Sequence, residues 1–220
     1  MINKFLKSIL RDGFLIGPSR LITRGVVQTL GRANAALHGF NGILPLGSHV
    51  SGLRRIRIGP DFRTHGPVWI EAVEGYAGQE YTPLISIGNS FRASDRLHIT
   101  AVGNVSIGDN CLFGSSVFVG DHAHGNYGES NPSHPDIAPA QRPLGNQGDV
   151  TIGSNCWIGD NVTIIGPVKV GYGAIIAANS VVTSDIRPMS ISVGSPARVV
   201  KSFNETEQRW SRLDEVPSGQ

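Results

Sequence analysis

The chain has 220 residues, and its 19 Lys and Arg residues against 17 Asp and Glu residues give a formal net charge of +2 at pH 7. This length suits one domain, and because the basic residues are spread along the chain, nucleic acid is not an expected partner. The 28 glycines and the 16% of charged residues indicate many tight turns and few exposed helices.

The N-terminal region contains apolar segments that basic residues interrupt. No apolar run within residues 1–20 reaches the ~18 residues of a membrane span, so we expect neither a cleaved signal nor a transmembrane helix. The apolar spacing of residues 19–37 predicts a helix that stops before Gly39. The basic residues near the N-terminus leave contact with a membrane surface open, but we expect this segment to pack on its own domain or on a neighbouring subunit.

A six-residue repeat dominates the second half of the chain. From Ile152 onward every sixth residue is branched and apolar, and the residue four places after each of these is small or apolar. The first series is Ile152, Ile158, Ile164, Val170, Ile176 and Val182, and the second is Cys156, Val162, Val168, Ala174, Ser180 and Ile186. Residue types that tolerate left-handed or tight turns recur between them, at Asn155, Asn161, Gly173 and Asn179. A period of six suits a short strand followed by a turn, and stacked units of this kind form a solenoid with one shared core.

Earlier copies of the repeat are less regular. The same spacing runs through residues 107–119, and weaker copies surround Ile58 and Ile87, with the polar stretch EGYAGQEYTP between them. Both cysteines, Cys111 and Cys156, fall on inward positions of the repeat. We therefore expect buried thiols rather than nucleophiles, in a reducing compartment such as the cytoplasm.

The repeat is lost between Val119 and Val150, in a stretch rich in Gly, Pro, Asn and His. Ordinary connections have ~4 to 6 residues, so a loop this long inside a compact repeat is expected to be functional. It opens with two histidines, His122 and His124, which are the first candidates for a site.

The rungs VTIGSNCWIGDNVTIIGPVKVGYGAIIAANSVVTSDIRP and the later motif VGSPARVVK resemble the hexapeptide-repeat acyltransferases. This family includes maltose and galactoside O-acetyltransferases, and the motif DHAHGNY resembles most the O-acetyltransferases of surface-polysaccharide pathways. The resemblance covers roughly residues 84–202 and implies an all-β solenoid, namely a left-handed parallel β-helix.

This fold implies three parts of the chain. They are an N-terminal helical extension at residues 1–50, the β-helix at 51–202 with an active-site loop at 121–149, and a C-terminal helix and tail at 203–220. Asn204 followed by Glu207 has the spacing of a capping box, which predicts the start of that final helix.

The resemblance implies an acetyl-CoA-dependent O-acetyltransferase that acts on a sugar hydroxyl, with the histidine at the base of the loop as general base. On this sequence that residue is His122, and a neutral imidazole with a pKa near ~6.5 suits the proton transfer. No Gly-x-Ser-x-Gly motif is present, and the inward cysteines also argue against a covalent intermediate. We expect direct attack by the acceptor.

Further residues are candidates for the acceptor side. Asp121 could bond the His122 imidazole and fix its tautomer. His124 and Tyr127 are candidate contacts of the acceptor, and His134 of the same loop is another. The sugar acetyltransferases have an acceptor-binding Asn in the preceding coil, and the matching stretch of this chain is ASDRLH, residues 93–98. It has Ser94 beside Asp95 in place of that Asn, which leaves the identity of the acceptor open.

The resemblance places the acetyl-CoA groove on the C-terminal rungs. The candidate donor-binding residues are Trp157, Asp160, Ala178, Thr183, Gly194, Ser195, Pro196, Arg198 and Lys201. The last two are basic and suit the phosphate end of coenzyme A.

The family also implies a homotrimer, because one solenoid offers only half a site. An antibiotic or amino-sugar N-acetyltransferase of the same fold is the alternative enzyme. A γ-type carbonic anhydrase with zinc bound by three histidines, and a scaffold without catalysis, are the alternatives from other classes. We expect no metal, because His122 and His124 lack the histidine spacing of that anhydrase family.

Overall fold

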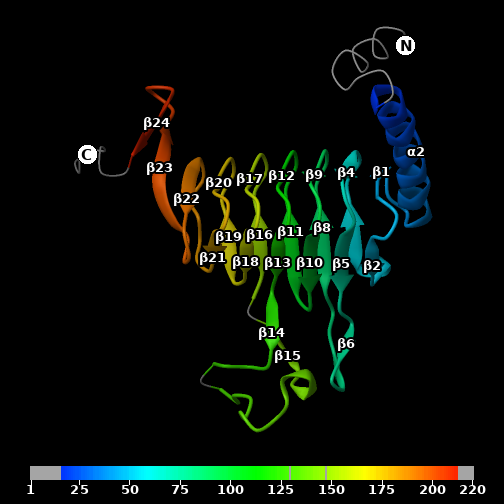
Figure 1. Ribbon diagram of the computed structural model, residues 1–220. Helices are drawn as coiled ribbons and strands as arrows, with labels where there is room; N and C mark the ends of the chain where they lie inside the picture. Colours follow the sequence, from blue (N-terminus) through cyan, green and yellow to red (C-terminus); the bar gives the residue numbers. More distant parts are fainter. Residues whose placement is uncertain (1–15, 129, 147, 213–220) are drawn as a thin grey trace.

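Short parallel strands form the three faces of a coil in the computed structural model, which describes residues 16–128, 130–146 and 148–212 (Figure 1). We name the faces sheets A, B and C. Sheet A contains β1 (Gly42–Ile43), β4 (Phe62–Thr64), β9 (Arg92–Ala93), β12 (Leu112–Phe113), β17 (Trp157–Ile158), β20 (Ile175–Ile176) and β22 (Ser190–Val193), followed by the antiparallel β23 (Arg198–Asn204) and β24 (Arg209–Arg212). Sheet B contains β2 (His49–Ser51), β5 (Val68–Ala72), β10 (Leu97–Ala101), β13 (Phe118–Gly120), β18 (Thr163–Ile165) and β21 (Val181–Val182). Sheet C contains β3 (Ile56–Ile58), β8 (Leu84–Ile87), β11 (Asn104–Ile107), β16 (Val150–Ile152) and β19 (Val168–Val170).

Both six-residue series predicted from the sequence point into the coil. Every member of the two series is buried, including Ser180, and together with the buried residues of the earlier coils their apolar members form one hydrophobic core. Both cysteines are buried and free, as predicted. The predicted turn positions Asn155, Asn161 and Asn179 have φ near 60° (59°, 56° and 61°), the left-handed conformation that lets the chain turn a corner between short strands.

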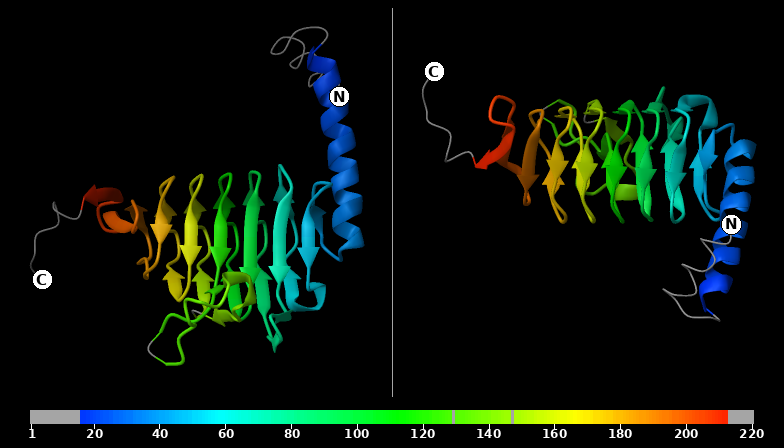
Figure 2. Two further views of the ribbon diagram at one scale, coloured as in Figure 1. Left: turned by 60° about the horizontal axis from the view of Figure 1, so that its bottom comes forward. Right: turned by 90° about the horizontal axis from the view of Figure 1, so that it is seen from above.

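The predicted N-terminal helix is α2 (Ile16–Leu37), and Gly39 follows it with φ 78°. The second half of α2 covers the first coil through the buried residues Gly31 and Ala35, and the Asn34 side chain donates a hydrogen bond to the carbonyl oxygen of Leu44 over 3.0 Å. The first half extends beyond the coil (Figure 2). Within the described part of the chain, no helix is long and apolar enough to cross a membrane. The basic residues near the N-terminus lie outside the described residues.

Two predicted boundaries were wrong. The coil begins at residue 42 rather than 51, because Gly42 pairs with Phe62 and His49 pairs with Trp69. The predicted C-terminal helix is a β-hairpin, in which β23 and β24 are antiparallel. The Asn204 side chain accepts hydrogen bonds from the backbone N–H of residues 206 and 207, as in a helix cap, but here the same bonds close a turn. The end of the predicted tail, residues 216–220, lies outside the described part.

Two excursions leave the coil on one side (Figure 1). The first is the polar stretch noted in the sequence, which forms the hairpin β6 (Gly75–Tyr76) and β7 (Gln79–Glu80). The second is the predicted active-site loop, whose ends pair as β14 (His122–His124) and β15 (Leu144–Asn146), with the short 3₁₀ helix η2 (Pro139–Gln141) between them. A similar 3₁₀ turn, η1 (Leu53–Arg55), leads into β3. The two excursions make one wall beside sheet B.

Candidate active site

His122 begins the long loop, directly after the chain leaves sheet B. Its ring Nδ1 lies 2.9 Å from Oδ1 of Asp121, and only 11% of the His122 side chain is exposed. The Asp121 carboxylate is fully buried. It also accepts hydrogen bonds from the backbone N–H of Val102 over 2.9 Å and of Gly103 over 2.7 Å, both in the preceding coil.

This arrangement fixes the His122 ring. An ionised carboxylate only accepts hydrogen bonds, so Nδ1 carries the proton and Nε2 keeps its lone pair. The two backbone donors hold the Asp121 carboxylate in place, since a buried charge needs such partners. The geometry therefore provides an oriented imidazole with one basic nitrogen.

His122 and His124 line a pocket of about 460 Å³ between sheet B and the two excursions. This volume lies in the range of small-molecule sites. The pocket's other lining residues come from three consecutive coils, from the β6 hairpin and from the active-site loop itself. Those that carry rings or polar groups are Trp69, Glu71, Tyr76, His98, Thr100 and Phe118.

An aromatic ladder crosses the outer face of sheet B beside His122. Trp69 and His98 stack with centroids 4.8 Å apart, and His98 meets Phe118 edge-on at 5.1 Å. Strand pairing sets this order, because His98 lies opposite Trp69 on one side and opposite Phe118 on the other. Burial lowers the pKa of His98; the nearby Glu71 opposes this effect and the nearby His122 adds to it. His98 is therefore neutral at cellular pH.

Three tyrosines contact residues of the active-site loop beside the pocket. The Tyr81 hydroxyl accepts a hydrogen bond from the backbone N–H of Leu144 over 2.8 Å and donates one to the carbonyl oxygen of the same residue over 3.2 Å. The Tyr76 ring packs edge-on against His124, with centroids 5.3 Å apart. The predicted acceptor contact Tyr127 is exposed, and its hydroxyl donates to the carbonyl oxygen of His124 and accepts from Arg142. In this chain Tyr127 shapes the loop and does not line the pocket.

The other predicted acceptor residues lie elsewhere. His134 sits 3.5 Å from the Asp136 carboxylate and lines a separate cavity of about 510 Å³ under the loop. Ser94 and Asp95 lie where the chain turns from sheet A to sheet B, and the Asp95 carboxylate pairs with the neighbouring Arg96 over 2.5 Å. Of the stretch ASDRLH that held this prediction, His98 is the residue that reaches the pocket.

The turn from sheet A to sheet B recurs in the later coils, and we name it the A–B corner. Most of the predicted donor-binding residues lie along this corner. Backbone hydrogen bonds join it from coil to coil, from Asn161 to Ser115 and from Asn179 to Asp160. Asp160, Ala178, Gly194, Ser195 and Pro196 lie on this corner, and Arg198 and Lys201 follow on β23. Trp157 lies on the face of sheet A and is 53% exposed. Thr183 lies where the chain leaves sheet B, on the corner that also carries His122 and that we name the B–C corner.

Asp160 has a structural partner in this chain. Its Oδ1 accepts a hydrogen bond from the backbone N–H of Ser115 over 2.6 Å. Asp109 makes the equivalent contact with the backbone N–H of Asn89 over 2.6 Å. The repeat therefore places this side chain to join neighbouring coils, whatever else it contacts.

The cysteines form a buried pair in the core. Cys111 Sγ contacts the carbonyl oxygen of Gly153, and Cys156 Sγ contacts that of Gly171, both over 3.2 Å. The hydrogen bond with Cys156 and burial raise the pKa of the Cys111 thiol. A protonated thiol in the core is not a nucleophile.

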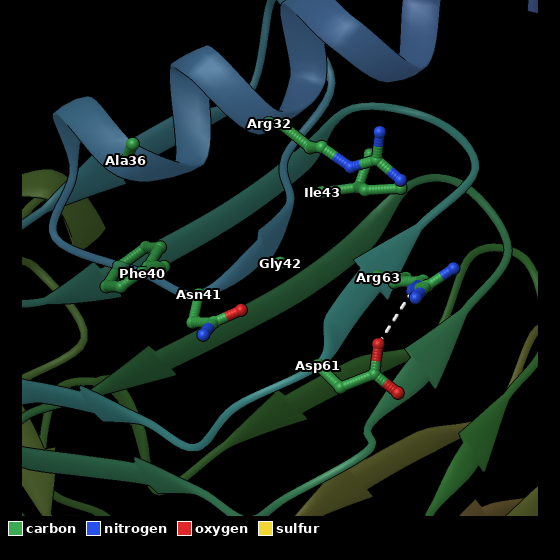
Figure 3. Close-up of a pocket in the computed structure, with 8 residues that line it drawn as sticks. All are labelled: Arg32, Ala36, Phe40, Asn41, Gly42, Ile43, Asp61 and Arg63. Carbon is green, nitrogen blue, oxygen red and sulfur yellow. Dashed lines mark hydrogen bonds and ion pairs between the residues drawn. The ribbon is translucent and has the colours of Figure 1, made fainter. Parts of the chain in front are cut away.

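Another cavity lies at the N-terminal end of the coil, between α2 and sheet A. It has about 390 Å³ and is lined by Arg32 and Ala36 of the helix, with Asp61 and Arg63 on its far side (Figure 3). Asp61 Oδ1 accepts a hydrogen bond from Arg63 over 2.8 Å. Arg92 and Arg63 hold the pKa of Asp61 below its usual value. Among the residues that the structure describes, none lines both this cavity and the His122 pocket.

Trp69, Glu71 and Tyr76 were not predicted from the sequence, and His98 was predicted only as part of the stretch ASDRLH. The stretch VWIEA alternates between buried and outward residues, which could have shown that Trp69 and Glu71 share the outer face of one strand. No pattern in the sequence shows that this face lies next to His122.

Known proteins resemble this chain in sequence and in fold. Residues 149–184 match the family described as bacterial transferase hexapeptide (six repeats), and residues 104–120 match the hexapeptide repeat of succinyl-transferase. The chain is 35% identical over 130 residues to the putative lipopolysaccharide biosynthesis O-acetyl transferase WbbJ of Escherichia coli K12. This alignment covers 59% of this chain and 66% of WbbJ. It is also 31% identical over 142 residues to the galactoside O-acetyltransferase of the same bacterium, and this alignment covers 64% of each protein. The chain thus spans just under two thirds of the length of these two relatives.

Among solved structures, a single-residue mutant of AntD, an N-acyltransferase from Bacillus cereus, in complex with dTDP and coenzyme A, aligns with a TM-score of 0.55. The alignment covers 76% of this chain and 83% of AntD at 18% identity, so the likeness concerns the fold alone. The inward six-residue series, the parallel coil and the sequence matches agree. Two segments of the chain thus match hexapeptide-repeat transferase families, and the chain is similar to hexapeptide-repeat acetyltransferases in sequence.

Proposed function

We propose that this protein is an acetyl-CoA-dependent O-acetyltransferase that transfers an acetyl group to a hydroxyl of a saccharide, with His122 as the general base. The observation that carries the proposal is the Asp121–His122 pair at the edge of a small-molecule pocket. The two O-acetyltransferase relatives support the hydroxyl as the group that reacts. A precursor of a surface polysaccharide is the acceptor we expect.

The chemistry follows from the oriented imidazole. Acetyl-CoA supplies an acetyl group that is already activated as a thioester. His122 accepts the hydroxyl proton at Nε2 while the acceptor oxygen forms its bond to the carbonyl carbon and the carbon–sulfur bond breaks. Asp121 stabilises the imidazolium through Nδ1, and the imidazolium returns the proton to the departing sulfur. His122 ends the cycle neutral, so no residue needs to be regenerated.

The position of the donor residues supports a homotrimer. Ser94, Asp95 and most of the predicted donor residues follow the A–B corner, whereas His122 lies on the B–C corner. One chain therefore carries the two halves of the proposed site on different corners. A neighbouring copy would complete the proposed site if its A–B corner lay against the B–C corner of this chain. This is the arrangement expected in the trimers that the family resemblance implies. We also expect a left-handed coil and a cytoplasmic location.

The donor side is tested first, by calorimetric titration with acetyl-CoA. We expect saturable binding that Arg198→Ala weakens and that Arg187→Ala, a matched change of an exposed arginine outside the predicted groove, leaves unchanged. An acceptor screen that follows thiol release then tests catalysis, where His122→Ala should lose about 10²- to 10⁴-fold in rate with acetyl-CoA binding retained. Full activity of His122→Ala would rule out the general base.

The same screen separates the alternatives. An N-acetyltransferase would acetylate amino sugars or antibiotic amines in preference to sugar hydroxyls. A carbonic anhydrase would contain stoichiometric zinc in metal analysis; the described residues hold no group of three potential ligands within one chain. Light scattering tests the trimer, and a monomer under native conditions would contradict it.

A further inference from the structure

The His122 pocket has a second wall that the proposed reaction does not use. It is built from β10, which pairs with β13 in sheet B, and from β5, which pairs with the other edge of β10. Both strands lie above the two excursions in Figure 1. Adjacent parallel strands are about 4.8 Å apart, so β5 lies about 10 Å from β13 along the coil axis. The pocket is thus long enough to hold more of an acceptor than the hydroxyl that reacts.

Glu71 supplies the negative charge on this wall. It stands two residues after Trp69 on β5, and its Oε2 accepts a hydrogen bond from the indole N–H of Trp69 over 2.9 Å. That bond fixes the carboxylate and leaves Oε1 with acceptor capacity. Lysine and arginine are absent from the described residues that line this pocket, so the negative charge of Glu71 is not neutralised there.

His98 supplies a neutral polar group between Glu71 and His122. The flanking rings of Trp69 and Phe118 hold its imidazole on the outer face of sheet B. Within the described part of the chain, neither ring nitrogen of His98 has a hydrogen-bond partner, so both can bind a ligand. Burial lowers the pKa of His98, which keeps one nitrogen a donor and the other an acceptor. A sugar ring with neighbouring hydroxyls carries both an acceptor and a donor, which match the two ring nitrogens of His98.

We propose that Glu71 and His98 form the acceptor-binding wall of the His122 pocket and select a saccharide that carries no negative charge. This inference rests on the proposed function, because it assigns the acceptor of that same site. An acidic sugar would place a carboxylate near Glu71 in a partly buried pocket, where like charges repel strongly. A neutral or amino sugar would donate hydrogen bonds to the same carboxylate.

Matched acceptors and matched variants test the charge selection. The acceptors are the methyl glucosides, galactosides and mannosides, each paired with its uronide, and the protein variants are Glu71→Gln and His98→Gln. Glu74→Gln is the control, because it removes the same charge from a residue that pairs with Arg55 over 3.2 Å and does not line the pocket. We measure kcat/KM by thiol release, and acceptor binding without acetyl-CoA by ligand-observed NMR.

The wild type should prefer the neutral rings over the uronides by about tenfold or more. Glu71→Gln should reduce this preference several-fold through the KM of the uronide, and His98→Gln should weaken binding of both rings, while Glu74→Gln behaves as the wild type. The inference is overturned if the wild type prefers uronides, or if Glu71→Gln and Glu74→Gln give the same ratio.

The two readouts separate this inference from the transferase proposal. Thiol release that needs His122 but ignores Glu71 and His98 would sink the inference and leave the transferase standing. Binding of neutral rings that depends on Glu71, without thiol release for any acceptor, would support the wall and reject the transferase.

Discussion

Asp121 Oδ1 lies 2.9 Å from Nδ1 of His122, and the same buried carboxylate is held by two backbone N–H groups of the preceding coil. The coil therefore determines the tautomer of the imidazole before any substrate binds. Neighbouring positions in the sequence supply the pair, but the backbone donors that make it rigid come from residues about 20 positions earlier.

Asp121→Asn tests this relationship. The amide cannot both accept from Nδ1 and satisfy the two backbone donors, so the His122 ring should lose its defined tautomer. We expect kcat to fall by ~10²- to 10⁴-fold while the affinity for acetyl-CoA stays the same. Steady-state kinetics and calorimetry check both. Asp149→Asn, at the other end of the loop, is the control and should keep its rate; equal rates for the two variants would contradict the role of Asp121.

Tyr81→Phe tests the anchoring of the loop. It removes the hydroxyl that both accepts from and donates to the backbone of Leu144, and leaves those partly buried groups unpaired. We expect a loss of about 1–3 kcal/mol in local stability, faster proteolysis within residues 121–149 and a higher KM for the acceptor. Tyr172→Phe is the control, because its exposed hydroxyl bonds Asn155 away from the loop. Identical proteolysis of both variants would argue against an anchor.

Substitutions of Asn110 test how much the left-handed backbone conformation at a turn of the coil costs in stability. The φ of Asn110 is 57°, a left-handed conformation that costs most residues about 1–2 kcal/mol. Asn110→Ala should lower the free energy of unfolding by about 1 kcal/mol, whereas Asn110→Gly should be nearly neutral because glycine adopts this conformation freely. Urea unfolding of the three proteins measures the difference. A loss for Gly as large as that for Ala would show that another property of the Asn side chain matters.

His98 gives a pH dependence with a defined sign. Burial lowers the pKa of His98 in the folded protein, so the unfolded chain takes up this proton first as the pH falls below about 6.5. The unfolded state then binds more protons, and the free energy of unfolding decreases from there through the lowered pKa.

His98→Gln should therefore make stability less dependent on pH below about 6.5 and leave the dependence above pH 7 unchanged. Urea unfolding at a series of pH values checks this expectation. His134→Gln is the matched control, since the His134 side chain is 69% exposed. A slope that His98→Gln does not alter would mean that burial does not perturb this imidazole.

The six-residue series predicted the coil, its core and its corners, because each repeat must bury the same two positions against its neighbours. It also predicted that Cys111 and Cys156 are inward. The C-terminal hairpin escaped prediction because Asn204 makes the same hydrogen bonds in a turn as in a helix cap. Local bonds of this kind do not determine what the chain does next.

The sequence by itself determined where the repeat stops and that His122 and its neighbour Asp121 stand at that point. Only the tertiary structure decided which residues share the pocket with them. Trp69 and His98 are 29 positions apart yet stack in register, since an excursion of arbitrary length can leave the coil without changing how its strands pair. Contact between coils depends on strand register, and spacing along the chain does not record that register once the repeat is interrupted.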